Sequence, residues 1–312
     1  MGGLKQGEAN KSGVTEFILL GFSGSPCFQL FIFILFFIMY SLTILGNFSI
    51  ILLIITHYCF HVPMYFFLCN LSFLEIWYTT ASIPKILAIF LGRSRSVSFM
   101  GCMLQMYFIF SFGCTEHFLI AVMAYNQYLA ICYPLHYSTF MDVSLCSKLA
   151  LACWLGGLLI IFIPAYMITR LSFCGHNVIN NFYCNMNSWI ALSCTDTHFL
   201  EITAFFIAII VIVGSCVITL LSYVYIVSTI LHIPSKKGQQ KAFSTCSFHL
   251  AVVIIWYGST IFLFVKTFRQ TSFERSKVVS IFNLIVVPLL NPFIYTLRNK
   301  EVREVLRNAL HK

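Results

Sequence analysis

Seven long apolar segments dominate the chain and restrict what it can fold into. They cover residues 27–55, 63–91, 99–132, 146–168, 199–231, 243–265 and 278–297. A helix needs about 20 mostly apolar residues to cross a bilayer. Only 9% of the residues are charged, against roughly 25% in a typical soluble domain. The bilayer is therefore the expected solvent.

The segments are expected to be helices, because backbone groups in lipid must bond within their own segment. The strand-like alternation of a membrane barrel is absent from them. We therefore predict an all-α membrane protein, a seven-transmembrane helix bundle that forms one domain over residues 1–312. It divides into a tail (1–26), the bundle (27–297) and a second tail (298–312), with a polar hinge over 233–240.

Charge alone does not orient the bundle. With the N-terminus outside, nine of the 19 Lys and Arg residues lie inside and ten lie outside or at outer span ends, a tie by the positive-inside rule. Asn10-Lys11-Ser12 is a glycosylation sequon on the polar first tail, as expected of an extracellular segment. Cysteines at 174, 184 and 194 in the longest loop indicate an oxidising side. Together they predict an extracellular N-terminus and a cytoplasmic C-terminus.

The last residues predict a short amphipathic C-terminal helix on the inner leaflet. Basic side chains alternate there with apolar ones at helical spacing, and they favour anionic lipid. The basic residues are Arg298, Lys300, Arg303 and Arg307.

Two acidic residues, Glu75 and Glu116, lie well inside apolar segments. A charge at that depth is costly and marks a functional candidate. Two arrangements stay open: facing carboxyls that share a cation or a proton, or a protonated network bonded to serines or Asn291. His117 and His249 are expected to be packed and hydrogen-bonded. The sequence has no metal-ligand spacing, no nucleophile–base pair and no phosphate loop, so we expect neither an enzyme nor a nucleic-acid binder.

Short motifs on these segments carry a resemblance to a known family. They are PMYFFL at 63–68, MAYNQY at 123–128, KAFSTC at 241–246 and PLLNPFIY at 288–295, preceded by VTEFILLGF at 14–22. In this order and spacing, over nearly the whole chain, the sequence resembles a vertebrate olfactory receptor. Such receptors belong to the rhodopsin-like class of G-protein-coupled receptors.

The resemblance implies two disulfides, Cys102 with Cys184 and Cys174 with Cys194. It also implies a structural sodium ion as the one candidate cofactor, near Glu75 and Glu116. The odorant cavity would lie between helices three, five and six, with a mostly apolar lining that suits a small hydrophobic ligand. Its residues would be Ile109, Phe110, Gly113, Cys114, Ile207, Val211, Tyr257, Thr260, Ile261 and Phe264.

The family's Met-Ala-Tyr-Asp-Arg-Tyr motif carries an anomaly here, since Asn126 and Gln127 stand in place of Asp and Arg. In the family the Arg meets the G protein and the Asp restrains it at rest. An amide pair cannot supply a charge-assisted contact. The change is expected both to loosen the resting state and to weaken coupling, and the sequence does not say which effect dominates. The implied coupling residues are Asn126, Gln127, Tyr128, His136, Tyr223, Lys241 and Tyr295.

The expected function is that of a plasma-membrane odorant receptor. A small hydrophobic volatile ligand would activate a heterotrimeric, stimulatory G protein of the olfactory type and raise cyclic AMP. One alternative is a receptor that binds ligand but couples poorly because of Asn126-Gln127. Another is a seven-span transporter that conducts ions past Glu75 and Glu116.

Overall fold

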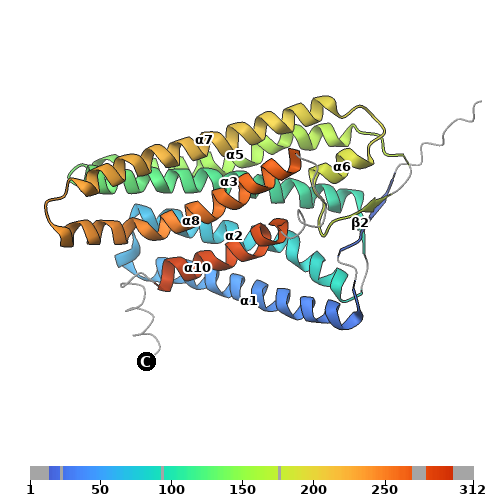
Figure 1. Cartoon of the computed structure of the whole chain (residues 1–312), viewed down its shortest axis with the longest axis horizontal. Coiled ribbons are helices and arrows are strands. Elements are labelled where there is room, and N and C mark those ends of the chain that lie inside the picture. Colours follow the sequence, from blue (N-terminus) through green and yellow to red (C-terminus); the bar gives the residue numbers. More distant parts are fainter. Residues whose placement is uncertain (1–13, 22–23, 93–94, 175–176, 269–278, 298–312) are drawn as a thin grey trace, which may run out of the picture.

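The structure is a computed structural model that describes residues 14–21, 24–92, 95–174, 177–268 and 279–297. Within these residues, six long helices run roughly along the long axis of the molecule (Figure 1). They are α1 (Pro26–Thr56), α2 (Pro63–Phe90), α3 (Phe99–Cys132), α5 (Val143–Thr169), α7 (His198–Leu231) and α8 (Lys236–Phe268).

Shorter elements connect the long helices. At one end lie η1 (Tyr58–Phe60) and α4 (Tyr137–Phe140), and α6 (Met186–Leu192) lies at the other. The last described segment begins before a π-helical turn, η2 (Phe282–Val286), that leads into α10 (Val287–Leu297). Asn47 of α1 donates a hydrogen bond to the Pro288 carbonyl oxygen at 3.4 Å, so the first and last helices lie side by side.

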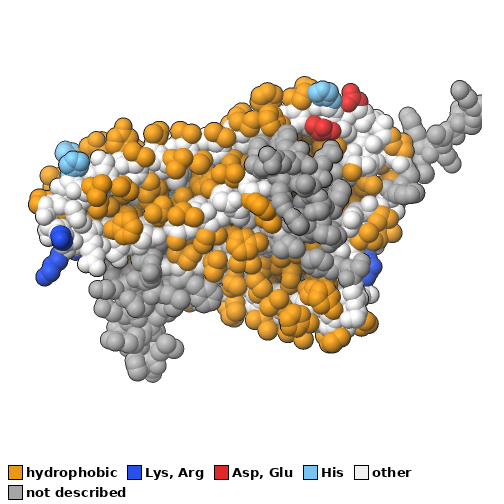
Figure 2. Space-filling view, in the orientation of Figure 1, with side chains coloured by type: hydrophobic (Ala, Val, Ile, Leu, Met, Phe, Trp, Pro, Cys, Tyr) orange, Lys and Arg blue, Asp and Glu red, His pale blue; other side chains and the backbone are white. Residues whose placement is uncertain are grey.

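In the described residues, four helices, α1, α3, α5 and α7, are long and apolar enough to cross a membrane. A fifth span results if Lys236–Ser244 and His249–Leu263, which meet at 49°, count as one bent helix. Hydrophobic side chains cover the middle of the visible face, and charged ones gather at its two ends (Figure 2). These features are those of a multi-pass membrane protein.

The two remaining predicted spans are less clear by length and composition. Helix α2 has 28 residues but carries Glu75 and Lys85. The last apolar helix, Val279–Pro292, is short, and the residues just before it lie outside the described part of the chain.

The predicted polar hinge over 233–240 is wrong in length. Helix α7 ends at Leu231 and α8 begins at Lys236. Ser235 starts α8, because its hydroxyl accepts a hydrogen bond from the Gly238 backbone N–H at 3.4 Å, as an N-cap does. The polar residues 236–240 therefore form the first turn of a helix.

Part of the first tail is a strand, which the sequence analysis did not predict. Strand β1 (Glu16–Leu19) lies between β2 (Ser96–Ser98) and β3 (Val178–Ile179), antiparallel to β2 and parallel to β3. Phe17 and Leu19 are 0% exposed. Residues 16–19 are thus a central strand, paired on both edges, and its alternate apolar side chains are buried at one end of the bundle.

Helices α3 and α5 pack closely at Gly157. A Cβ at this position would overlap the Thr115 hydroxyl and lie 2.7 Å from the Ser111 carbonyl oxygen. Nearby, the Trp154 indole N–H of α5 donates to Asn70 Oδ1 of α2 at 3.1 Å. Helix α3 also contacts α2, α7 and α8, so it lies in the centre of the bundle, where it carries more of the candidate functional residues than any other helix.

Candidate ligand and coupling sites

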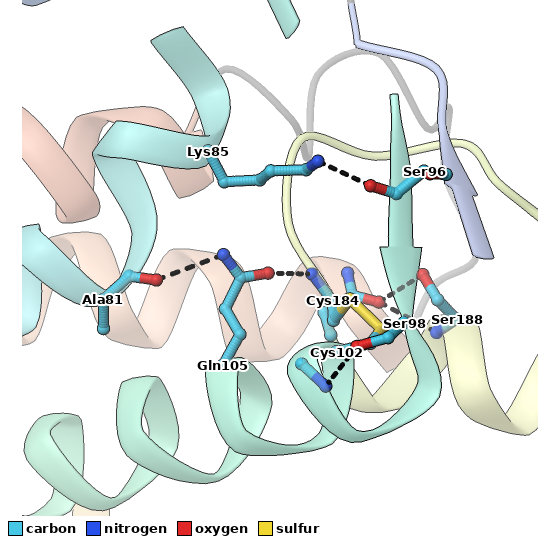
Figure 3. Close-up of a disulfide and its surroundings, with 10 residues drawn as sticks. Ala81, Lys85, Ser96, Ser98, Cys102, Gln105, Cys184 and Ser188 are labelled. Carbon is cyan, nitrogen blue, oxygen red and sulfur yellow. Dashed lines mark hydrogen bonds between the residues drawn. A yellow bond between two sulfur atoms is a disulfide. The ribbon is translucent and has the colours of Figure 1, made fainter. Parts of the chain in front are cut away.

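Two disulfides mark one end of the molecule, which we call the disulfide end. Cys102, in the first turn of α3, is bonded to Cys184, and Cys174 is bonded to Cys194. Figure 3 shows how the first bridge is supported: the Gln105 amide donates to the Ala81 carbonyl oxygen at 3.1 Å and accepts from the Cys184 backbone N–H at 3.0 Å. The long loop is thereby held against both α2 and α3.

The same end carries a cluster of four aromatic rings, which we call the aromatic cluster. Phe17 of β1 lies 4.9 Å from Trp189 of α6, 6.0 Å from Phe173 and 6.1 Å from Phe99, measured between ring centroids. Lys85 of α2 reaches the same region, where its ammonium donates to the Ser96 carbonyl oxygen of β2 at 2.6 Å (Figure 3). The aromatic cluster connects three segments that are far apart in sequence.

Glu75 and Glu116 meet in the interior of the bundle, and both are 0% exposed. The Asn291 amide of α10 donates to Glu75 Oε1 at 2.5 Å, and the Glu116 carboxyl interacts with that of Glu75. Glu75 Oε2 and both Glu116 oxygens have no hydrogen-bond donor among the described residues. These three oxygens could bind a shared proton or a small cation.

The two interior histidines are packed and hydrogen-bonded, as predicted. The Trp256 indole N–H donates to His117 Nδ1 at 3.2 Å, and the Tyr223 hydroxyl lies 2.8 Å from His249 Nδ1. In the described part of the chain, no three His, Cys, Asp or Glu side chains gather as metal ligands.

The expected odorant residues on α3 and α8 include one open position and one unused polar group. A Cβ built on Gly113 would meet nothing within 4 Å. The Thr260 hydroxyl is buried and has no hydrogen-bond partner among the described residues. By contrast, the Tyr257 hydroxyl lies 3.4 Å from that of Thr219 on α7. Thr260 therefore has hydrogen-bonding capacity that its own neighbours do not use.

The other expected lining residues differ in how they are placed. Ile109 and Val211 are buried, and Phe110, Cys114 and Ile207 are half-buried. Ile261 is 42% exposed and shares an outward face of α8 with Ile254, so its placement differs from the expectation that it lines a cavity. Seven residues span nearly two helical turns, which puts 254 and 261 on one side. The side chain of Phe264 lies outside the described residues.

The opposite end of the bundle, which we call the motif end, holds Asn126 and Gln127. Both side chains are buried, at 1% and 5% exposure. The Tyr137 hydroxyl of α4 donates to Asn126 Oδ1 at 2.9 Å. Burial raises the pKa of Tyr137 to about 12, so the phenol stays protonated at neutral pH and remains a donor.

A cavity of about 470 Å³ opens at the motif end between α3 and α8. Its charged lining residue is Lys241, and Gln127 supplies an amide. The complete lining is Gln127, Ala130, Ile131, Pro134, Gly238, Lys241 and Ala242.

The remaining expected coupling residues lie around this end. Tyr128 packs its ring against Tyr225 of α7 at 5.7 Å, and Tyr223 is 7% exposed. His136 is exposed and lies next to Leu135, which is 90% exposed. The side chain of Tyr295, the sequon at Asn10 and the predicted tail helix lie outside the described residues.

The comparison with known proteins decides the family. A family model described as olfactory receptor matches residues 36–312. This chain belongs to the olfactory receptor family. It is 58% identical over 297 residues to olfactory receptor 6F1 of Homo sapiens, covering 95% of this chain and 96% of that protein. It is also 56% identical over 301 residues to olfactory receptor 287 of Rattus norvegicus, covering 96% and 97%.

The family is one of signalling receptors, so this olfactory receptor is not an enzyme. Olfactory receptor 6A2 of Homo sapiens, 47% identical over 307 residues, gives the same assignment. The comparisons do not support the transporter alternative, since 95% of this chain aligns with olfactory receptor 6F1.

Proposed function

We propose that this olfactory receptor binds a small hydrophobic odorant in the half of the bundle nearer the disulfides and couples at the motif end to a stimulatory G protein. The cavity between α3 and α8 is the observation that carries the coupling half of the proposal. The cavity lies beside the family's coupling motif. A movement of the start of α8 away from α3 would widen the cavity.

On the ligand side, Gly113 and Thr260 support the proposal. The open space at Gly113 leaves room for an apolar body, and the unpartnered Thr260 hydroxyl is suited to an odorant oxygen. An odorant that binds better when α8 leans outward shifts the population toward the active receptor. The G protein would then raise cyclic AMP.

The proposal includes a membrane topology of seven spans in the plasma membrane. The N-terminus and both disulfides would face the exterior, and Asn10 would carry a glycan. The motif end would face the cytoplasm, followed by an amphipathic helix after Leu297. The two disulfides at the opposite end support this orientation, because disulfides form and persist on the oxidising, extracellular side.

Glu75 and Glu116 are the residues that would hold a sodium ion. Their fit rests on the three carboxyl oxygens that have no donor among the described residues. A bound sodium would offset carboxylate charge inside the bundle, where an unpaired charge is costly. Asn291 would orient Glu75 in either case, through the hydrogen bond it already donates.

Substitution of the Asn126-Gln127 pair tests the proposed G-protein coupling directly. Cells would carry the natural chain or the double variant Asn126→Asp with Gln127→Arg, at matched surface levels, and cyclic AMP would be measured with an odorant panel. A response from the natural chain supports the proposal. A response from the double variant alone would mean that the chain binds ligand but couples poorly. Surface-expressed chains that are both silent to every odorant would contradict it.

A further inference from the structure

Met64 of α2 contacts both amides of the anomalous pair. The Asn126 side-chain amide donates to Met64 Sδ at 3.6 Å, and the Gln127 side-chain amide donates to the same sulfur at 3.6 Å. Met64 lies in the first turn of α2. One thioether therefore joins α2 to two consecutive residues of α3.

The two amides are not held equally. Asn126 is bonded on both sides, because its Oδ1 also accepts from the Tyr137 hydroxyl. For Gln127, the thioether is the hydrogen-bond partner that the described residues provide. A thioether is a weak acceptor, so this contact opens more readily than an ion pair.

Gln127 also lines the cavity between α3 and α8. Its side chain is thus positioned between two partners, the sulfur on one side and the cavity on the other. While the amide bonds to Met64, it is held toward α2. When that contact opens, the same donor becomes available to a peptide in the cavity.

We propose that Met64 is a positioning residue of the coupling site, whose thioether holds the Gln127 amide against α2 in the resting receptor. This inference rests on the proposed coupling function. In this arrangement a neutral contact takes the place of the missing ion pair. The Met64 sulfur restrains the Gln127 amide at rest, and the amide becomes available to the G protein once it leaves the sulfur. The partner contact at this position is an amide hydrogen bond rather than a charge-assisted one.

The first test is basal cyclic AMP at matched surface levels. Met64→Leu keeps the side-chain volume and removes the acceptor, so basal signalling should rise about two- to fivefold, in line with the loss of one weak hydrogen bond to Gln127. In the Asn126→Asp, Gln127→Arg background the same change should have little effect, because a charged pair restrains itself. An equal effect in both backgrounds would show that Met64 acts through packing alone, and would overturn the inference.

A matched control is Met141→Leu. Met141 lies at the same end, is 3% exposed, and packs in the same core. Basal signalling of the Met141→Leu receptor should stay at the level of the natural chain. A rise equal to that of Met64→Leu would overturn the inference.

A second measurement does not depend on signalling. In purified receptor labelled with ¹³C at the methionine methyl groups, Met64→Leu identifies the Met64 signal. Gln127→Leu should shift this signal and leave that of Met141 unchanged. An unshifted Met64 signal overturns the inference even if the receptor couples normally, whereas a shift in a receptor that never raises cyclic AMP supports the contact and counts against the proposed function.

Discussion

A substitution of Thr260 tests the proposed odorant site most directly. Its buried hydroxyl has no partner among the described residues. Thr260→Val keeps the shape and removes the hydroxyl. Potency for odorants that carry an oxygen should fall about five- to tenfold, since one hydrogen bond contributes roughly 1–1.5 kcal/mol. Hydrocarbon odorants of similar size should be unaffected, and dose–response curves of cyclic AMP measure both.

Ser259 offers the control for this change. Its hydroxyl already donates to the Ile255 carbonyl oxygen of its own helix at 2.7 Å, so Ser259→Ala should leave both odorant classes unchanged. If Thr260→Val weakens oxygenated and hydrocarbon odorants equally, the hydroxyl acts on packing and does not orient the ligand.

At this scale the sequence predicted residue identities better than their partners. The pair Asn126-Gln127 stands out against the family motif without a structure. Its contact with Met64 does not, because a thioether is a partner only once α2 and α3 are placed side by side. Likewise, the sequence left open whether Glu75 and Glu116 face each other or bond to serines or Asn291, because the oxygens left without a donor depend on rotamers that no sequence pattern specifies.

Among the helices, the contact of α3 with α5 should be the most sensitive to the addition of one methyl group at Gly157. Gly157→Ala places a Cβ against Thr115 and the Ser111 carbonyl, and backbone cannot move aside as a flexible side chain can. Overpacking of this kind costs about 1–3 kcal/mol. The fraction of receptor at the cell surface and the midpoint of thermal unfolding in detergent should both fall.

Gly214 of α7 is the matched control, because a Cβ there would meet nothing within 4 Å. Gly214→Ala should leave surface level and unfolding midpoint at or above the natural values, since alanine favours helix. Equal losses from both changes would mean that the tight α3–α5 contact is not what limits stability.

The helices also show where periodicity succeeds and fails as a guide. Apolar runs predicted α1, α2, α3 and α7 to within a residue or two at each end. The start of α8 was missed, because Ser235 caps a polar first turn and hydropathy does not register a cap. The place of Ile261 in the cavity lining stays a prediction: the side chain is 42% exposed, and apolar residues lie on both the exposed side (Ile254) and the buried side (Val253) of this part of α8, so hydropathy does not fix the helix rotation.

Across the whole molecule, the least predictable part is the disulfide end. A four-residue strand in a tail carries too few residues for a reliable pattern, and its partners lie about 80 and 160 residues away (as the pairing of Ile18 with Ser96 and Val178 shows). The disulfides were implied by family resemblance alone. Local sequence therefore predicted the bundle, whereas the end that closes over it depends on contacts between distant segments.

The aromatic cluster makes that end testable as a unit. Phe17→Ala removes a ring that is 0% exposed and contacts Trp189, Phe99 and Phe173. Such a truncation costs about 3–5 kcal/mol, and it should release β1 from β2 and β3. Hydrogen exchange at β2 and β3 should accelerate, and less receptor should reach the surface. Val178→Ala is the control, because Val178 is 40% exposed and pairs with β1 through its backbone. Exchange that stays slow after Phe17→Ala would mean that the two disulfides hold the loop without the strand, and that residues 14–20 are dispensable for the closed end of this receptor.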